Sequence, residues 1–79
     1  MHVDHHPLIT EFPEFKTKIL DLKDSDETFA KLFDDYHRID DEVVRMEEDT
    51  EPAADHVIED AKKRRLKLKD ELYAILTAA

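Results

Sequence analysis

The chain contains no cysteine and no glycine, and each absence excludes a class of function. Without cysteine there are no disulfides, no thiolate metal ligands and no thiol redox chemistry. Without glycine there are no glycine-rich phosphate loops and no dinucleotide fingerprints. No apolar run approaches the ~20 residues of a membrane-spanning helix, and the first residues carry no signal-peptide pattern. We therefore expect no membrane span and a cytoplasmic location.

Charge is abundant but uneven along the 79 residues, whose net charge is −9. Residues 1–61 hold 6 basic and 19 acidic side chains, whereas residues 62–79 hold 6 basic and 2 acidic ones. The overall acidity repels phosphate backbones and disfavours general nucleic-acid binding. The asymmetry predicts that the basic end pairs with the acidic middle, within the fold or across a dimer.

The N-terminal part predicts a flexible tail over residues 1–6 and a first helix over 13–23. Pro13 suits a first helical turn, where its missing N–H would have no intrahelical partner. Apolar residues follow at helical spacing, which places them on one face: Phe12, Phe15, Ile19 and Leu22. Leu8 extends this stripe, so the helix could begin near Pro7.

Two long helices are predicted over 26–48 and 53–77. Asp24 or Ser25 is the expected N-cap of the first, and Thr50 that of the second. Each helix carries an apolar seam with alternating spacings of 3 and 4. On the first helix the seam is Phe29, Leu32, Tyr36, Ile39, Val43 and Met46. On the second it is Ile58, Ala61, Arg65, Leu68, Leu72, Ile75 and Ala79.

A single antiparallel register joins the two seams, from Met46 opposite Ile58 to Phe29 opposite Ile75. The predicted fold is therefore all-α: one domain over 1–79, with a short N-terminal helix followed by a long antiparallel, coiled-coil-like helical hairpin. The same register brings Asp40 near Lys62 and acidic Glu42 near Arg64, pairs that would help to set the orientation.

Further apolar residues lie off the seams, where a two-helix hairpin cannot bury them. They are Leu66, Tyr73 and Leu76 on the last helix, with Phe33 and Val44 on the one before it. Either the N-terminal helix or another chain must cover this second stripe, or both do so in a dimeric bundle. Arg65 is the charged member of a seam, and we expect it to reach Asp40, Glu42 or an acid from a second chain. These six residues are the candidate interaction residues.

The run FAKLFDDYHRIDDEVVRMEE (29–48), followed by KRRLKLKDELYAIL (63–76), resembles the YdcH-like family of small bacterial proteins. FPEF (12–15) also resembles the start of these proteins, so the likeness covers about residues 12–76. Its most specific parts are LFDDYHRID (32–40) and LKLKDEL (66–72). The resemblance implies a short helical domain of unknown function, and it carries no catalytic or ligand residues. The histidine-rich N-terminus and the acidic turn EEDTEPAAD (47–55) depart from the pattern.

No catalytic, cofactor or metal site is predicted. The carboxylates lie along solvated faces, whereas acid–base catalysis needs two in contrasting environments. An N-terminal group could hold a divalent ion loosely, but a flexible terminus gives no fixed geometry; its members are His2, Asp4, His5 and His6. His37 and Asp41 have chelate spacing on a helix and lack a third ligand.

The sequence thus favours a non-enzymatic, self-associating helical hairpin that forms a dimer or tetramer and could present a stripe to a protein partner. The alternative is a regulatory binder of nucleic acid or an anionic surface through the basic segment 62–69.

Overall fold

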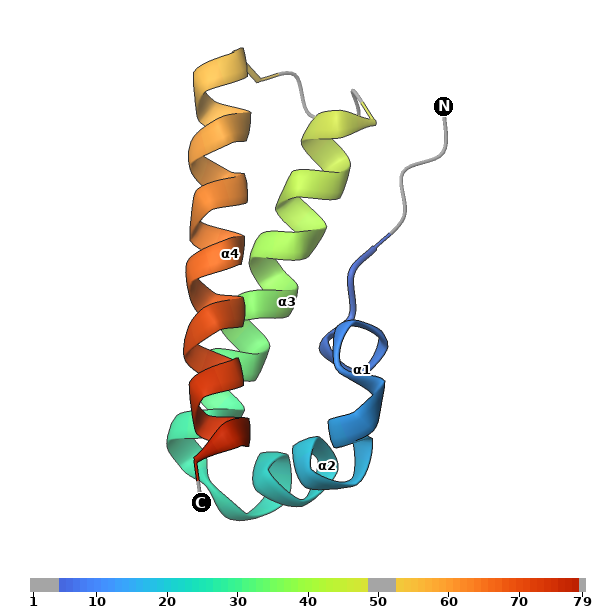
Figure 1. The fold of residues 1–79 in the computed structure, drawn as a ribbon. Helices are drawn as coiled ribbons and strands as arrows, with labels where there is room; N and C mark the ends of the chain where they lie inside the picture. The colour runs from blue at the N-terminus through green and yellow to red at the C-terminus, as the bar shows by residue number, and fades with distance from the viewer. Residues whose placement is uncertain (1–4, 49–52, 79) are drawn as a thin grey trace.

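The computed structural model describes residues 5–48 and 53–78, and within them every regular element is a helix. Helices α3 (Glu27–Glu47) and α4 (Asp55–Thr77) run antiparallel along most of the molecule, which measures 40 × 21 × 17 Å (Figure 1). This confirms the predicted all-α fold with a helical hairpin. The N-terminal residues 5–25, which we call the N-terminal segment, lie along one side of the hairpin and pass under its lower end.

The N-terminal segment is broken into three short pieces where one helix was predicted. They are α1 (Leu8–Glu11), a 3₁₀ turn η1 (Pro13–Phe15) and α2 (Lys16–Ser25). The break falls at Phe12, whose φ and ψ of −129° and 65° are not helical. Proline disfavours the helical conformation of the residue before it, so Pro13 both ends α1 and starts η1. The predicted helix therefore begins three residues late, and its upstream extension is a separate turn.

The junction between α2 and α3 is capped by Asp26 instead of the predicted Asp24 or Ser25. The Asp26 side chain accepts a hydrogen bond of 3.1 Å from the backbone N–H of Phe29. Ser25 still belongs to α2, where its hydroxyl donates to the carbonyl of Asp21. Asp26 is extended, with φ −127° and ψ 108°, as an N-cap residue usually is. The expected cap Thr50 lies outside the described residues.

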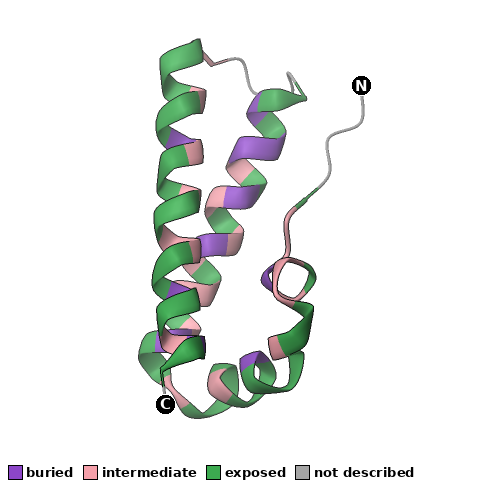
Figure 2. Ribbon diagram, viewed as in Figure 1, coloured by how far each residue is buried: buried purple, intermediate pink, exposed green. Residues whose placement is uncertain are grey.

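Two apolar clusters hold the hairpin together, and their members agree with the predicted register. The cluster near the turn contains Val43, Met46 and Ala61, with Ile58 packed against it. The larger cluster lies at the other end, where the N-terminal segment joins the two long helices (Figure 2). Its buried members are Leu8, Ile19, Phe29, Tyr36, Leu72 and Leu76.

The N-terminal segment therefore covers part of the second apolar stripe. This is the first of the alternatives that the sequence left open. Ile19 of α2 and Leu8 of α1 share a cluster with Leu76 of α4. The ammonium of Lys18 adds a polar link, since it donates to the carbonyl of Leu76 at 2.7 Å. Burial of Leu8, Ile19 and Leu76 stabilises the fold by roughly 1.5–3 kcal/mol for each side chain. The N-terminal segment is therefore part of the core.

Candidate functional site

A buried carboxylate, Asp40, lies at the centre of a connected group of polar residues from the N-terminal segment, α3 and α4. It is 1% exposed and is the only buried charged residue among those that the structure describes. One of its oxygens, Oδ1, accepts a hydrogen bond of 2.9 Å from Nη1 of Arg65 on α4. Of the acids expected to meet the seam arginine, Asp40 is the one that does so. The pair links the two long helices at mid-length.

The other oxygen of Asp40 faces the N-terminal segment. Its Oδ2 accepts a 2.9 Å hydrogen bond from the backbone N–H of His6, and Nδ1 of His5 lies 3.3 Å away. The hydroxyl of Tyr36 donates to the carbonyl of His6 at 2.6 Å. Burial, reinforced by the negative charges of Glu11 and Asp40, raises the pKa of Tyr36 well above that of a free phenol. His5 and His6 are therefore held in place, contrary to the predicted flexible tail; residues 1–4 of that tail lie outside the described residues.

His37 uses both of its ring nitrogens on backbone groups. The N–H of Leu8 donates to Nε2 at 3.3 Å, so Nδ1 carries the ring proton and donates to the carbonyl of Phe33 at 2.8 Å. The chelate spacing of His37 and Asp41 noted in the sequence does not give a pair of ligands here, because both ring nitrogens of this imidazole are used by backbone groups. Its observed role is to tie α1 to α3.

Glu11 and Lys69 make a second link between the N-terminal segment and α4. Nζ of Lys69 donates to Oε1 of Glu11 at 2.8 Å, and Nδ1 of His6 lies 3.5 Å from the same oxygen. The hydrogen bond from Lys69 is the main reason that the pKa of Glu11 is lowered, and the positive charges of Lys69 and His6 act in the same direction. The carboxylate form of Glu11 therefore favours the folded state.

Acid is expected to weaken this second link. Because the pKa of Glu11 is lower in the folded than in the unfolded chain, its contribution is present above the unfolded value of about 4.5 and is lost as the pH falls through the folded value. Lys69→Met should cost up to about 1 kcal/mol at neutral pH and should flatten this part of the pH dependence. Urea unfolding between neutral and acidic pH measures both. An identical pH dependence in Lys67→Met and Lys69→Met would contradict this account.

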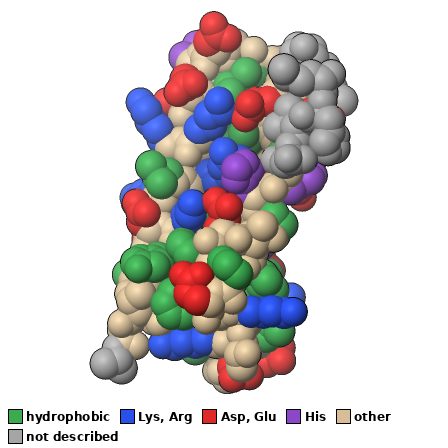
Figure 3. All heavy atoms as spheres, turned by 45° about the vertical axis from the view of Figure 1, so that its right-hand side comes forward, with side chains coloured by type: hydrophobic (Ala, Val, Ile, Leu, Met, Phe, Trp, Pro, Cys, Tyr) green, Lys and Arg blue, Asp and Glu red, His purple; other side chains and the backbone are tan. Residues whose placement is uncertain are grey.

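The six candidate interaction residues are scattered over different environments. Leu66 and Tyr73 are 57% and 45% exposed on α4, whereas Leu76 and Val44 are buried. Phe33 is half-buried under the ammonium of Lys23, 4.9 Å from its ring centre, and Arg65 is held by Asp40. On the face that holds the N-terminal segment, hydrophobic side chains gather in the lower half (Figure 3). The rings of Phe12 and Phe15 lie 5.1 and 6.2 Å from that of Tyr73.

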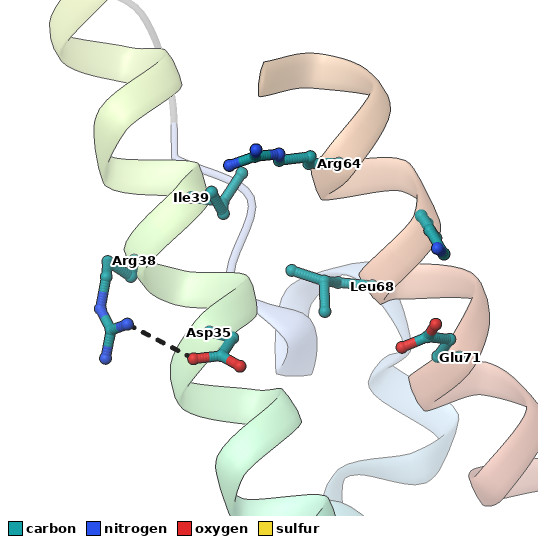
Figure 4. Close-up of a pocket in the computed structure, with 7 residues that line it drawn as sticks. Asp35, Arg38, Ile39, Arg64, Leu68 and Glu71 are labelled. Carbon is teal, nitrogen blue, oxygen red and sulfur yellow. Dashed lines mark hydrogen bonds and ion pairs between the residues drawn. The ribbon is translucent and has the colours of Figure 1, made fainter. Parts of the chain in front are cut away.

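The opposite face of the hairpin is a groove between α3 and α4. Two adjoining cavities, of about 310 and 370 Å³, share Ile39 and Arg64 in their linings. Figure 4 looks into the first of them, with Ile39 and Leu68 pointing between the helices and the N-terminal segment lying behind. Five apolar residues line this open groove: Ile39, Met46, Val57, Ala61 and Leu68. Eight charged residues complete the lining: Arg38, Arg45, Arg64, Lys67, Asp35, Glu42, Asp60 and Glu71.

The basic segment 62–69 is divided between internal pairing and exposure. Lys62 lies 3.7 Å from Glu47, Arg65 binds Asp40, and Lys69 binds Glu11. The expected pair of Asp40 and Lys62 is therefore wrong, because Arg65 takes that carboxylate. Glu42 and Arg64 line the same cavity, with no ion pair between them among the described residues. The other basic residues of the segment, Lys63 and Lys67, are exposed.

Sequence reasoning missed most of the Asp40 group. Asp40 and Arg65 were identified from their places in and beside the seams. The contribution of His6 is made by its backbone N–H and carbonyl, which any residue offers, so no side-chain pattern could mark it. Tyr36 was assigned to the core, and its hydroxyl function follows only from the neighbouring backbone.

Comparisons with known proteins agree with the resemblance. The family described as "Protein of unknown function (DUF465)" matches residues 29–76. Relatives described as "Uncharacterized protein YdcH" from Escherichia coli (strain K12) and Shigella flexneri are each 35% identical over 65 residues. That alignment covers 82% of this chain and 88% of each relative. No solved structure matches. Among the described residues, no helix is long and apolar enough to cross a bilayer. The chain belongs to the YdcH-like DUF465 family, whose function is unknown.

Proposed function

We propose that the protein is a non-enzymatic interaction module and that two copies of the chain associate through the open groove between α3 and α4. The observation that carries this proposal is the charge of the groove. Its lining holds four basic and four acidic residues, although the chain as a whole has a net charge of −9. Two such chains repel each other over most of their surfaces. The groove is a face on which they can meet without that repulsion.

The apolar lining supplies an attractive term. Ile39 and Leu68 are only half-buried in the single chain, and Val57 is 43% exposed. The N-terminal segment already covers part of the opposite side of the hairpin, so this groove is where the hairpin would accept two further helices. A two-fold axis makes each interface self-complementary, and basic residues of one copy then face acidic residues of the other. The product is a dimeric bundle with four long helices.

The alternative function, binding of nucleic acid or an anionic surface through residues 62–69, has weaker support. Three of the six basic side chains of that segment are already in ion pairs with Glu47, Asp40 and Glu11. Arg64 and Lys67 line the open groove together with Asp35 and Glu71. The remaining positive charge is therefore set among carboxylates that a phosphate backbone would have to approach.

The experiment is light scattering on a sizing column, over a range of micromolar concentrations. We expect a dimer for the natural chain and a dimer at least about tenfold weaker for Arg64→Glu, because each two-fold interface contains the reversed charge twice. Lys63→Glu is the matched control, since it makes the same charge change at the neighbouring exposed position outside the groove lining.

Three results would overturn the groove as the interface: a natural chain that stays monomeric, equal weakening by Lys63→Glu, or dissociation by Leu66→Glu with no effect of Arg64→Glu. The last result would place the interface on the face that contains Leu66 and Tyr73. Circular dichroism of each variant confirms that the helices are retained.

A further inference from the structure

The N-terminal segment brings an imidazole against two carboxylates of α3. Nδ1 of His5 lies 3.3 Å from Oδ2 of Asp40 and 3.3 Å from Oδ1 of Asp41. Each of the three residues offers one ligand atom, and these atoms all lie within 4.8 Å of one another. The two aspartates are consecutive in the sequence, whereas the histidine arrives from a segment 35 residues away.

The two separations from His5 fit ligands of a single coordinated ion. Zinc binds histidine nitrogen and carboxylate oxygen at about 2.0–2.2 Å, and two tetrahedral ligands at that range lie roughly 3.3–3.6 Å apart. The separations of His5 from both carboxylates have this size. One imidazole and two carboxylates form a donor set without sulfur, which suits divalent zinc and its first-row neighbours and gives no preference for a soft ion.

Asp40 has the surroundings of a positioned ligand. Its side chain is 2% exposed, and Arg65 holds Oδ1 on the side that faces α4. The other oxygen, Oδ2, accepts the backbone N–H of His6 at 2.9 Å and keeps a second lone pair on the side of His5. Hydrogen bonds from outer residues orient metal-binding carboxylates in the same way. The guanidinium is the nearest fixed cation, and two carboxylates against it leave one net negative charge at the site. His5 and Asp41 are about half-exposed, so an ion has an open path from solvent.

We propose that His5, Asp40 and Asp41 form a binding site for a divalent transition-metal ion, with zinc as the ion that the donor set fits, and that the bound ion fastens the N-terminal segment to α3. The site lies on the side of the hairpin opposite the open groove. The proposed metal site therefore does not depend on the proposed dimer. It also differs from the loose N-terminal group considered from the sequence, because two of its three ligands belong to a long helix.

The test is calorimetric titration of zinc chloride into the full chain after treatment with a chelator. We expect one ion per chain, and Asp41→Asn should weaken binding at least about tenfold because it removes one ligand charge. Asp41 is 55% exposed, so this change spares the core. Asp34→Asn is the matched control: it makes the same substitution on α3, two turns earlier and on the same helix face, at an exposed residue. His2→Ala tests binding by the end of the chain.

Unchanged affinity in Asp34→Asn and His2→Ala, together with the loss in Asp41→Asn, would support the site. Equal affinity in Asp41→Asn and the natural chain would overturn it. A loss in His2→Ala as large as that in Asp41→Asn would also overturn it, because the ion would then be held by the terminus. No heat of binding at millimolar zinc would do the same. Dimer mass, measured in parallel, reports separately on the proposed function.

Discussion

Arg65→Leu is expected to lower the free energy of unfolding by about 3–5 kcal/mol, because it leaves a buried carboxylate without its cation. Asp40 is 1% exposed and cannot turn to water, whereas Arg65 retains 19% of its side-chain surface. The hydrogen bond from His6 alone does not replace a guanidinium 2.9 Å away. Urea unfolding at neutral pH, followed by circular dichroism, measures the loss.

Two further variants separate this explanation from a simple loss of packing. Lys63→Leu replaces a cation by leucine at an exposed position of the same helix outside the groove, and it should change stability by no more than about 0.5 kcal/mol. Asp40→Leu combined with Arg65→Leu should restore much of the loss, since apolar residues can replace a buried ion pair at little cost. A double variant as unstable as Arg65→Leu would contradict the assigned role of Asp40.

The hairpin was predictable because the apolar spacing along each helix can be recognised without knowing what the helix packs against. The spacings from Phe29 to Met46 and from Ile58 to Ile75 place one apolar stripe on each helix. Burial against each other is the simplest way for two such stripes to leave water. A short turn between them leaves only the antiparallel arrangement. The seam residues of both observed clusters follow from these facts.

The N-terminal segment was less predictable because its structure depends on backbone groups and on one proline. The conformation of Phe12 follows from Pro13, because proline disfavours a helical residue before it. The periodic apolar residues on either side of Phe12 favour a continuous helix instead, and the two signals conflict in the sequence. The hydrogen bonds of His6 with Asp40 and Tyr36 are made by its main-chain atoms. No pattern of side chains in the sequence predicts them. The open groove could not be predicted from the pattern either, since Ile39 belongs to a seam yet is only half-buried where α3 and α4 leave space.

Phe29 belongs to the buried cluster that joins the N-terminal segment, α3 and α4. It is fully buried in the cluster that also contains Ile19, Leu72 and Leu76. Phe29→Ala keeps the backbone N–H that Asp26 caps, so the change removes packing and leaves the cap in place. Truncation of a buried phenylalanine costs about 3–5 kcal/mol. A chain of this length has a total stability of roughly 4–12 kcal/mol, so we expect a large unfolded fraction at moderate temperature.

The stability loss in Phe29→Ala is to be compared with that in Val43→Ala. Val43 is equally buried, but its cluster near the turn joins only the two long helices, and the lost methyl groups are worth about 2 kcal/mol. Phe29→Ala should therefore cost more, and Leu66→Ala, at an exposed position, should stay within about 0.5 kcal/mol of the natural chain. Thermal and urea unfolding measure all three. If Val43→Ala proved as damaging as Phe29→Ala, the turn end of the hairpin would be the main stabilising core, and the N-terminal segment would be an addition to a hairpin that is stable without it.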